Sequence, residues 1–353
     1  MRSLRGGFVD RVSTGLAAVR EFEGDEGLVF LRWPRAVCET KDLPSYHDVQ
    51  SRSVGGRLAV KMSPFDYHRP DTVDEAVALL ETYGGDGKVL AGGQSLLPVL
   101  ALRLTHLGHL IDIGRVQGLQ SIEVDDDGTV SVGATVTHAR VERSDVMAAA
   151  APAVAGAMPH VGHRAIRSRG TVCGSLAHAD PAAELPAVAL AVGAEMIVRG
   201  PAGQRTMGAG DFFEGYLSSA LGEDELLVGV RFPAWAPRAG WSVLEVSRRH
   251  GDFALVGLVT TLEIDEAGLL RRPALSLFGV ASTPVRVAEA EQLLDGNAPD
   301  PALLAEAAKV VSGALEARAD DHASSEYRAH VAGVLTRRGL AEAAARATER
   351  AGV

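Results

Sequence analysis

The sequence predicts an α+β protein with more than one domain. Its 353 residues exceed one ordinary core, because domains usually hold roughly 100–200 residues. Short strand-like and helix-like runs alternate irregularly between residues 62 and 232, whereas strand-like runs precede helix-like runs after residue 241. A cluster of proline and glycine at residues 233–240 separates these parts and is the best candidate for a linker.

The first part opens with a helix signal. Thr72 and Glu75 have the spacing of a capping box, and a glycine pair at residues 84 and 85 ends the helix. Between them runs an apolar stripe at helical spacing: Val73, Ala76, Val77 and Leu80. Further on, the patterns predict strands at 88–91, 109–113, 129–132, 195–199 and 225–232, helices at 146–158 and 184–192, and a long loop at 164–175.

The second part has a different order. Strands are expected at 242–247, 253–264 and 273–281. Helices are expected at 285–294, 301–317 and 324–348. Strands followed by helices indicate a separate α+β domain, which we place at residues 241–348.

Composition excludes several classes of protein. The formal net charge is −10 and no dense run of lysine and arginine exists, so we expect no nucleic-acid partner. No stretch approaches 18 uninterrupted apolar residues, so we expect no transmembrane segment. The basic start is not followed by an apolar run before Arg11, which argues against a secretory signal. We therefore expect a cytoplasmic protein.

The cysteine content limits the redox chemistry. Cys38 and Cys173 are the two cysteines of the chain, so a disulfide framework is excluded. An iron–sulfur cluster needs four cysteine ligands, or two cysteines and two histidines, and two distant cysteines do not provide either set. Any redox cofactor of this chain is therefore expected to be organic, and we predict no metal site.

Two loops of small residues are candidate phosphate-binding sites. The first follows a predicted strand, and the second follows Gly170. Glycine allows backbone N–H groups to approach an anion, and consecutive N–H groups form anion-binding nests. Each loop alone is more often an ordinary turn, and neither matches a standard nucleotide fingerprint. The loops consist of Ala91, Gly92, Gly93, Gln94 and Ser95, and of Thr171, Val172, Cys173, Gly174 and Ser175.

Titratable residues follow the second loop. Asp180 precedes a proline, so its backbone is kept out of the α region, and its carboxylate has two interpretations. It caps the following helix, or it accepts hydrogen bonds from a ribose. His178 is a candidate general base, but a single histidine without a partner is more often structural, so we assign no catalytic residue.

The ordered motifs resemble a known family. They are Phe65-Asp66-Tyr67-His68-Arg69-Pro70, the segment 88–96 around the first loop, the segment 169–181 around the second, Arg248-Arg249-His250-Gly251-Asp252-Phe253-Ala254, and Ser325-Glu326-Tyr327-Arg328. Together they resemble the FAD-binding medium subunits of the xanthine dehydrogenase and carbon monoxide dehydrogenase family, over roughly residues 62–345.

The resemblance implies a fold and residue roles. The expected fold is a flavin domain of the vanillyl-alcohol oxidase and p-cresol methylhydroxylase type at 62–236, with subdomains at about 62–115 and 116–236, followed by an α+β domain of the CO dehydrogenase flavoprotein C-terminal type. By resemblance, the two loops hold the pyrophosphate of noncovalent FAD. Glu184 stands at the position where the family has an acidic residue near the adenosine ribose. Leu227 stands at the position where the family has a leucine packed against the isoalloxazine ring.

Two positions depart from the family pattern. Cys173 and Ser175 replace a glycine and an asparagine of the usual second loop. If the position of Cys173 requires a positive φ, the backbone is strained by roughly 1 kcal/mol or more, and otherwise the change is harmless. Gln94 replaces the histidine that many carbon monoxide dehydrogenases carry, which favours an organic substrate such as an N-heterocycle or an aldehyde.

The resemblance also implies a function as an electron relay. A partner subunit with molybdopterin hydroxylates the substrate, a small partner with [2Fe–2S] clusters carries single electrons, and FAD on this chain passes them to an external acceptor, in a dimer of heterotrimers. One alternative is a stand-alone flavin oxidase or reductase of the same fold. Another is a nucleotide-binding assembly module without redox function.

Residues 1–61 read differently from the rest of the chain. Family-like sequence begins at Met62, so this segment is expected to be an extension outside the flavin domain, disordered or not native to the protein. The competing interpretation is a genuine extension that packs on a partner through Phe30, Leu31 and Trp33, because such residues are uncommon in disordered tails.

Overall fold

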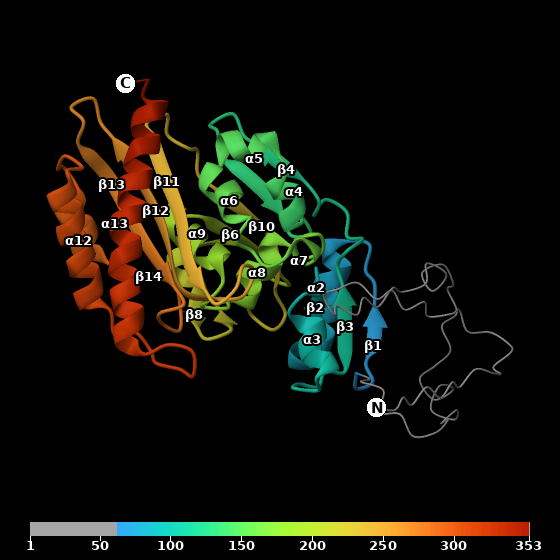
Figure 1. The fold of residues 1–353 in the computed structure, drawn as a ribbon. Coiled ribbons are helices and arrows are strands. Elements are labelled where there is room, and N and C mark those ends of the chain that lie inside the picture. Colours follow the sequence, from blue (N-terminus) through green and yellow to red (C-terminus); the bar gives the residue numbers. More distant parts are fainter. Residues whose placement is uncertain (1–61, 353) are drawn as a thin grey trace, which may run out of the picture. The chain divides into compact units, whose positions relative to one another are not determined.

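The structure is a computed structural model that describes residues 62–352 (Figure 1). These residues belong to one compact unit. The expectations for residues 1–61 lie outside the described residues.

The first layer is a parallel sheet with the strand order β1-β3-β2. Its strands are β1 (Asp66–His68), β2 (Gly87–Leu90) and β3 (His109–Asp112). Helix α2 (Val73–Tyr83) and the 3-10 turn η2 (Gly84–Asp86) connect β1 to β2, and α3 (Leu96–Ala101) follows the first glycine loop. The predicted cap is confirmed, because the Thr72 hydroxyl accepts a hydrogen bond from the Glu75 N–H at 3.2 Å. Gly84 ends α2 with a φ of 51°.

The second layer is an antiparallel sheet with the order β4-β5-β10-β6-β7. Its strands are β4 (Ile122–Val124), β5 (Val130–Gly133), β6 (Glu195–Gly200), β7 (Gly203–Gly208) and β10 (Leu226–Phe232). The helices of this region are α4 (His138–Glu142), α5 (Asp145–Ala150), α6 (Pro152–Ala157), α7 (Arg164–Arg167), α8 (Val172–His178), α9 (Glu184–Val192) and α10 (Ala209–Phe212). A small hairpin joins β8 (Phe213–Gly215) to β9 (Ser218–Ser219).

Two expectations for this region are wrong, and one strand was not expected. The predicted helix 146–158 is two helices, because Ala151 leaves the helical region with φ −141° and ψ 60°, and Pro152 begins α6. The predicted loop 164–175 contains α7 and the start of α8. Strand β7 was not predicted, because its exposed residues alternate with half-buried ones and it presents no apolar stripe.

The third layer is an antiparallel sheet with the order β11-β12-β13-β14. Its strands are β11 (Ala239–Ser247), β12 (Ala254–Ile264), β13 (Leu270–Phe278) and β14 (Val285–Arg286). Helices α11 (Ala288–Leu294), α12 (Pro301–Ala314) and α13 (Ser325–Arg350) follow, as the order of strands before helices predicts. Figure 1 shows α12 and α13 on one face of this sheet. The expected helix 285–294 is shorter, because β14 takes its first residues.

Strand β12 contributes side chains to two hydrophobic cores. Val256 and Leu258 lie in the core beneath α11, α12 and α13, whereas Val259 lies in the core formed by the first two layers. Helix α9 packs on this second face, against β12 and β13. The Thr261 hydroxyl donates to the Ala191 carbonyl at 3.3 Å, and the Gly279 N–H donates to the Pro181 carbonyl at 2.8 Å. The third layer is therefore joined directly to the segment that follows the second glycine loop.

The motif at the start of α13 has a structural role. The Arg328 side chain is only 6% exposed and forms an ion pair with Asp320. Its guanidinium also donates to the carbonyls of Leu255 and Gly279, at the ends of β12 and β13. Arg328 therefore ties the start of α13 to the ends of the two inner strands of the third sheet.

Candidate functional site

The first glycine loop leaves the carboxyl end of β2 with its backbone donors available. Gly93 has a φ of 72°, a conformation that side chains with a Cβ rarely adopt. The Gln94 amide donates to the Gly92 carbonyl at 3.1 Å, which closes the loop on itself. Within the described part of the chain, the backbone N–H groups at positions 92–95 donate no hydrogen bond. Consecutive free N–H groups of this kind suit an anion.

The second loop is the first turn of α8 together with its cap. The Thr171 hydroxyl accepts from the Gly174 N–H at 3.0 Å, and the Val172 N–H donates to the Val136 carbonyl at 3.1 Å. Cys173 lies within α8 and does not have a positive φ, so its replacement of glycine causes no backbone strain. Its thiol is buried, and burial raises its pKa, so it is not a reactive thiolate.

The fold brings the two loops into direct contact. A Cβ atom at Gly92 would lie 2.3 Å from the Arg169 carbonyl oxygen and 2.6 Å from the Gly170 Cα. On its other side, Gly170 packs on the buried His138, whose ring would lie 3.0 Å from a Cβ atom at position 170. A Cβ at Gly174 would lie 3.8 Å from the Ala91 Cβ. Only glycine allows this approach, and the arrangement of two opposed loops fits the diphosphate of a dinucleotide.

Asp180 lies in the short turn between α8 and α9. Ala179 ends α8 in the left-handed conformation, with a φ of 52°. The Asp180 carboxylate accepts a hydrogen bond from the Ala182 N–H at 2.9 Å, and the Asp180 carbonyl accepts one from Ala183 at 3.0 Å. The carboxylate therefore shapes the turn before α9, and one of its oxygens has no partner within residues 62–352.

Glu184 begins α9 and is only 6% exposed. Burial raises its pKa to about 7, and the charge of Glu245 on β11 acts in the same direction. His160 lies in the same cluster, with its Nδ1 atom 3.4 Å from a Glu245 carboxylate oxygen. The contact with Glu245 raises the pKa of His160. Two buried carboxyl groups and one histidine thus meet where the third sheet packs on the flavin-type region.

Leu227 lies in the hydrophobic core and is 3% exposed. The strand β10 that carries it has an irregular register between Leu227 and Gly229. Between them, the Val228 carbonyl accepts a hydrogen bond from Ala134 at 3.0 Å. The irregularity changes the direction of the strand next to Leu227, and β-bulges of this kind often lie near functional sites.

Within residues 62–352, the rings of the two histidines near the second loop form no hydrogen bond with another side chain. His178 is half-buried, and burial lowers its pKa. His138 is 4% exposed, and neither ring nitrogen makes a hydrogen bond of ordinary geometry with the described residues. Burial lowers the pKa of His138 to about 4, so the ring is neutral at pH 7. These properties suit packing behind Gly170.

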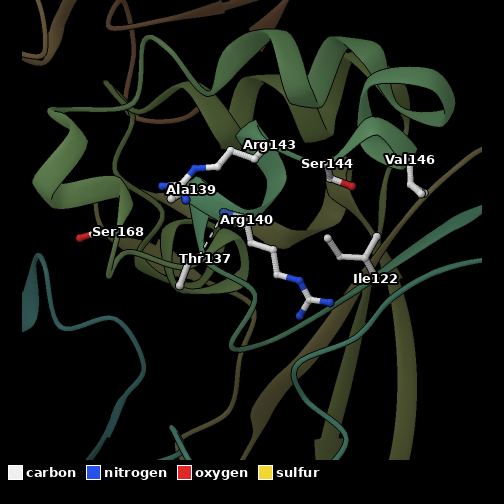
Figure 2. A pocket seen from close by; sticks show the side chains of 8 residues that line it. All are labelled: Ile122, Thr137, Ala139, Arg140, Arg143, Ser144, Val146 and Ser168. Atoms are coloured by element: carbon white, nitrogen blue, oxygen red, sulfur yellow. Dashed lines mark hydrogen bonds between the residues drawn. The ribbon is translucent and has the colours of Figure 1, made fainter.

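The sequence did not reveal a basic pocket beside the second loop. Figure 2 shows its lining, with the side chains of Arg140 and Arg143 extending in different directions. The volume is about 700 Å³. We call it the Arg140 pocket, and it is lined by Ile122, Thr137, Ala139, Arg140, Arg143, Ser144, Val146 and Ser168. These residues come from several short elements, so no local motif could have identified the pocket.

Neither a metal-binding cluster nor a membrane-spanning helix occurs within residues 62–352. Residues 62–352 contain no group of three or more histidine, cysteine, aspartate or glutamate side chains able to hold a metal ion. In the same residues, no helix combines the length and apolar character needed to cross a bilayer.

Comparison with known proteins gives the family. Residues 63–235 match the FAD binding domain in molybdopterin dehydrogenase, and residues 241–343 match the CO dehydrogenase flavoprotein C-terminal domain. Caffeine dehydrogenase subunit beta from Pseudomonas sp. (strain CBB1) is 36% identical over 288 residues, which cover 81% of this chain and 97% of that protein. The carbon monoxide dehydrogenase medium chain of Hydrogenophaga pseudoflava is 35% identical over 282 residues, which cover 80% of this chain and 98% of that protein.

Solved structures agree with these relatives. A carbon monoxide dehydrogenase chain from Hydrogenophaga pseudoflava superimposes with a TM-score of 0.79 at 36% identity, over 81% of this chain and 99% of that chain. A chain of quinoline 2-oxidoreductase from Pseudomonas putida 86 has a TM-score of 0.77 at 36% identity, over 81% and 99% of the two chains. The resemblance, the predicted fold and FAD as the cofactor are confirmed. The chain therefore belongs to the family of FAD-binding medium subunits of molybdenum hydroxylases, the oxidoreductases that include carbon monoxide dehydrogenase and xanthine dehydrogenase.

Proposed function

We propose that this chain is the electron relay of a heteromeric molybdenum hydroxylase. It would take electrons from [2Fe–2S] clusters on a partner subunit and deliver them to an external acceptor. The observation that supports this most is the contact of Gly92 with Arg169 and Gly170, which places two glycine-containing loops face to face in a chain of an FAD-binding family.

We propose that the two loops hold the diphosphate of noncovalent FAD. The free N–H groups at positions 92–95 are the donors of the first loop. In the second loop the Thr171 hydroxyl and the Ser175 side chain add polar groups near Gly174. The proposed binding residues are those of both loops: Ala91, Gly92, Gly93, Gln94, Ser95, Thr171, Val172, Cys173, Gly174 and Ser175.

Three further residues belong to the proposal. The second carboxylate oxygen of Asp180 is available to a ribose hydroxyl, because the first accepts from Ala182. We retain Glu184 for the ribose and Leu227 for the ring system. They are 6% and 3% exposed, so direct contact with FAD requires that their present neighbours move.

Bound FAD supplies a centre that exchanges electrons singly and in pairs. The residues of this chain bind and orient it. The close packing of the loops keeps their donors fixed, so little reorganisation accompanies binding. No side chain of this chain needs to act on the hydroxylated substrate.

The proposed partners are a large molybdopterin subunit and a small iron–sulfur subunit, in a dimer of heterotrimers. The names of the relatives support a multi-subunit enzyme, since they include a medium chain, a subunit beta and the medium subunit of nicotine 6-hydroxylase from Paenarthrobacter nicotinovorans. The low cysteine content supports a reducing, cytoplasmic location.

We propose an organic substrate for the complete enzyme, such as an N-heterocycle. Relatives named for caffeine and nicotine are 36% and 37% identical, and those named for carbon monoxide are 34% and 35% identical. These values do not separate the two groups, so the proposal depends on Gln94 in the first loop.

Flavin absorbance tests the relay. The proposal predicts that an N-heterocyclic substrate bleaches the flavin band only when both partner subunits are present. Bleaching of this chain alone by substrate would instead establish a stand-alone oxidase. Absence of a flavin band after incubation with excess FAD would establish an assembly module.

A further inference from the structure

The Arg140 pocket is basic although the chain as a whole is acidic. It has a volume of about 700 Å³, and its lining contains two arginines and no carboxylate. The formal net charge of the chain is −10, so the positive charge of the pocket is opposite in sign to the net charge of the protein. A pocket of this size is within the usual range for small-molecule sites, about 300–1000 Å³.

The two arginines keep donors available for a ligand. The nearest carboxylate in sequence, Glu142, forms a two-point ion pair with Arg167, at 2.9 and 3.0 Å. This ion pair occupies both oxygens of Glu142, although the charge of Arg143 also acts on that carboxylate and lowers its pKa. One terminal nitrogen of Arg140 donates to the Gln120 carbonyl, which anchors that guanidinium and leaves its other N–H groups free to bind.

Hydroxyl groups in the lining complete the polar half of the pocket. Thr137 and Ser144 accept hydrogen bonds at 3.2 Å from the backbone N–H groups of Arg140 and Met147. Their hydroxyl protons remain available to an anionic oxygen, because each hydroxyl can donate as well as accept. Ile122 and Val146 provide an apolar wall. The pocket therefore combines guanidinium groups, hydroxyl donors and an apolar surface.

This combination suits one class of ligand. Guanidinium groups bind phosphate oxygens with two parallel hydrogen bonds. Because the side chains of Arg140 and Arg143 extend in different directions, each would contact a different anionic group of one ligand. The apolar wall suits a flat base or a sugar ring. We propose that the Arg140 pocket binds a nucleoside diphosphate or a ligand that contains one, at a site separate from the FAD loops.

The site is distinct from the FAD loops but joined to them. No residue of the two loops, and none from residues 62–115, lines the pocket. However, Thr137 pairs with Thr171 in an isolated β-bridge, and the His138 N–H donates to the Gly170 carbonyl at 2.9 Å. One wall of the pocket is thus bonded to the back of the second loop.

Titration calorimetry on the FAD-loaded full chain, and on the complex where partners copurify, tests the site. ADP and inorganic pyrophosphate are the probes. We expect one ADP per chain, with pyrophosphate binding more weakly. The double variant Arg140→Gln/Arg143→Gln should bind ADP at least about tenfold more weakly, because two charge-assisted contacts are lost.

Two further variants make the test specific. Lys309→Gln/Arg350→Gln removes two exposed positive charges from α12 and α13 and should leave ADP binding unchanged. Ser168→Asp adds a negative charge to the exposed rim of the pocket and should also weaken ADP binding, without removing the Arg140 anchor. FAD content, measured by absorbance, should be equal in all variants.

Several results would overturn the proposal. One is that the FAD-loaded protein does not bind ADP. Another is that the arginine variant and Ser168→Asp bind ADP as tightly as the control variant does. Loss of FAD from the folded arginine variant would assign the pocket to the FAD site instead. Pyrophosphate binding as tight as ADP would overturn the nucleoside part. A chain that carries no FAD would contradict the proposed electron relay instead. The flavin absorbance detects that outcome independently of ADP binding.

Discussion

Gly92 lies so close to Gly170 that a Cβ atom on Gly92 would stand 2.6 Å from the Gly170 Cα. The neighbouring Arg169 carbonyl would be nearer still, at 2.3 Å. These are backbone atoms, which cannot rotate away as a flexible side chain can. The contact therefore fixes the distance between the two proposed FAD loops.

Gly92→Ala should separate the loops and lower the FAD content of the purified chain. We expect at least a tenfold weaker affinity for FAD, because displacement of one loop removes its donors from the cofactor. Fluorescence titration of the apoprotein with FAD measures this. Gly210→Ala is the matched control, since a Cβ there meets nothing within 4 Å and its φ is not in the positive range. Equal affinity in both variants would contradict the proposed role of the contact.

Gly93→Val and Gly174→Val should each abolish FAD binding, for different reasons. At Gly93 the φ of 72° disfavours any branched side chain, and Leu97 would be 2.8 Å from the new Cβ. At Gly174 the new Cβ would be 2.6 Å from the Thr171 hydroxyl oxygen and would break the cap of α8. Circular dichroism should show a retained fold, and flavin absorbance should be lost. Full flavin occupancy in both variants would show that the loops are ordinary turns.

Glu184 should make stability depend on pH near neutrality. Its pKa is raised from 4.5 to about 7, so the folded state binds its proton more tightly than the unfolded chain. The free energy of unfolding should therefore fall as pH rises from about 4.5 to about 7, by up to about 3 kcal/mol, and then level off. The raised pKa of His160 has the same sign: its contribution is present below pH 6.5 and is lost as pH rises through its folded pKa.

Urea unfolding at pH 5 and pH 8 measures this dependence. The difference in unfolding free energy between the two pH values should shrink in Glu184→Gln, because the amide does not ionise. Glu306→Gln is the control, since that side chain is 56% exposed. A Glu184→Gln variant with the wild-type pH dependence would show that Glu184 ionises without cost in the folded state.

Arg328 should contribute more to stability than its ion-pair partner. Arg328→Met would leave the carbonyls of Leu255 and Gly279 without their donor, so we expect a loss of at least about 2 kcal/mol. Asp320→Asn should cost about 1 kcal/mol or less, because the Asp320 side chain is 51% exposed. Urea unfolding of both variants measures the difference. Equal losses would indicate that the ion pair, and not the carbonyl contacts, holds α13.

Local signals in the sequence were sufficient for some elements. A capping threonine, an apolar stripe and a terminal glycine predicted α2, and a buried run ending at Gly193 predicted α9 over the residues observed. The segment 164–175 was misassigned, because its arginines and serines resemble a loop while tertiary contacts such as Arg167 with Glu142 stabilise helix there. Strand β7 has no apolar periodicity and depends on pairing with β6.

The candidate site was predictable only in part. Glycine content singled out both loops as candidates, and the family resemblance implies FAD as their ligand. Their mutual contact was not predictable, since it depends on how β2 and α8 are placed by separate layers. Two further features were not predictable: the Arg140 pocket and the cluster of Glu184, His160 and Glu245. Each combines residues from several elements, so the spacing of residues in the sequence does not indicate it.

The sharing of β12 between the two cores, together with the packing of α9 against it, has a consequence for folding. Seven residues of α9 are buried, and its neighbours include β12 and β13 of the third layer. Release of the third layer would expose α9 and one side of β12 to water, and the remaining core would lose part of its apolar burial. The two sequence-defined parts should therefore unfold as one cooperative transition, which calorimetry would record as a single heat-absorption peak.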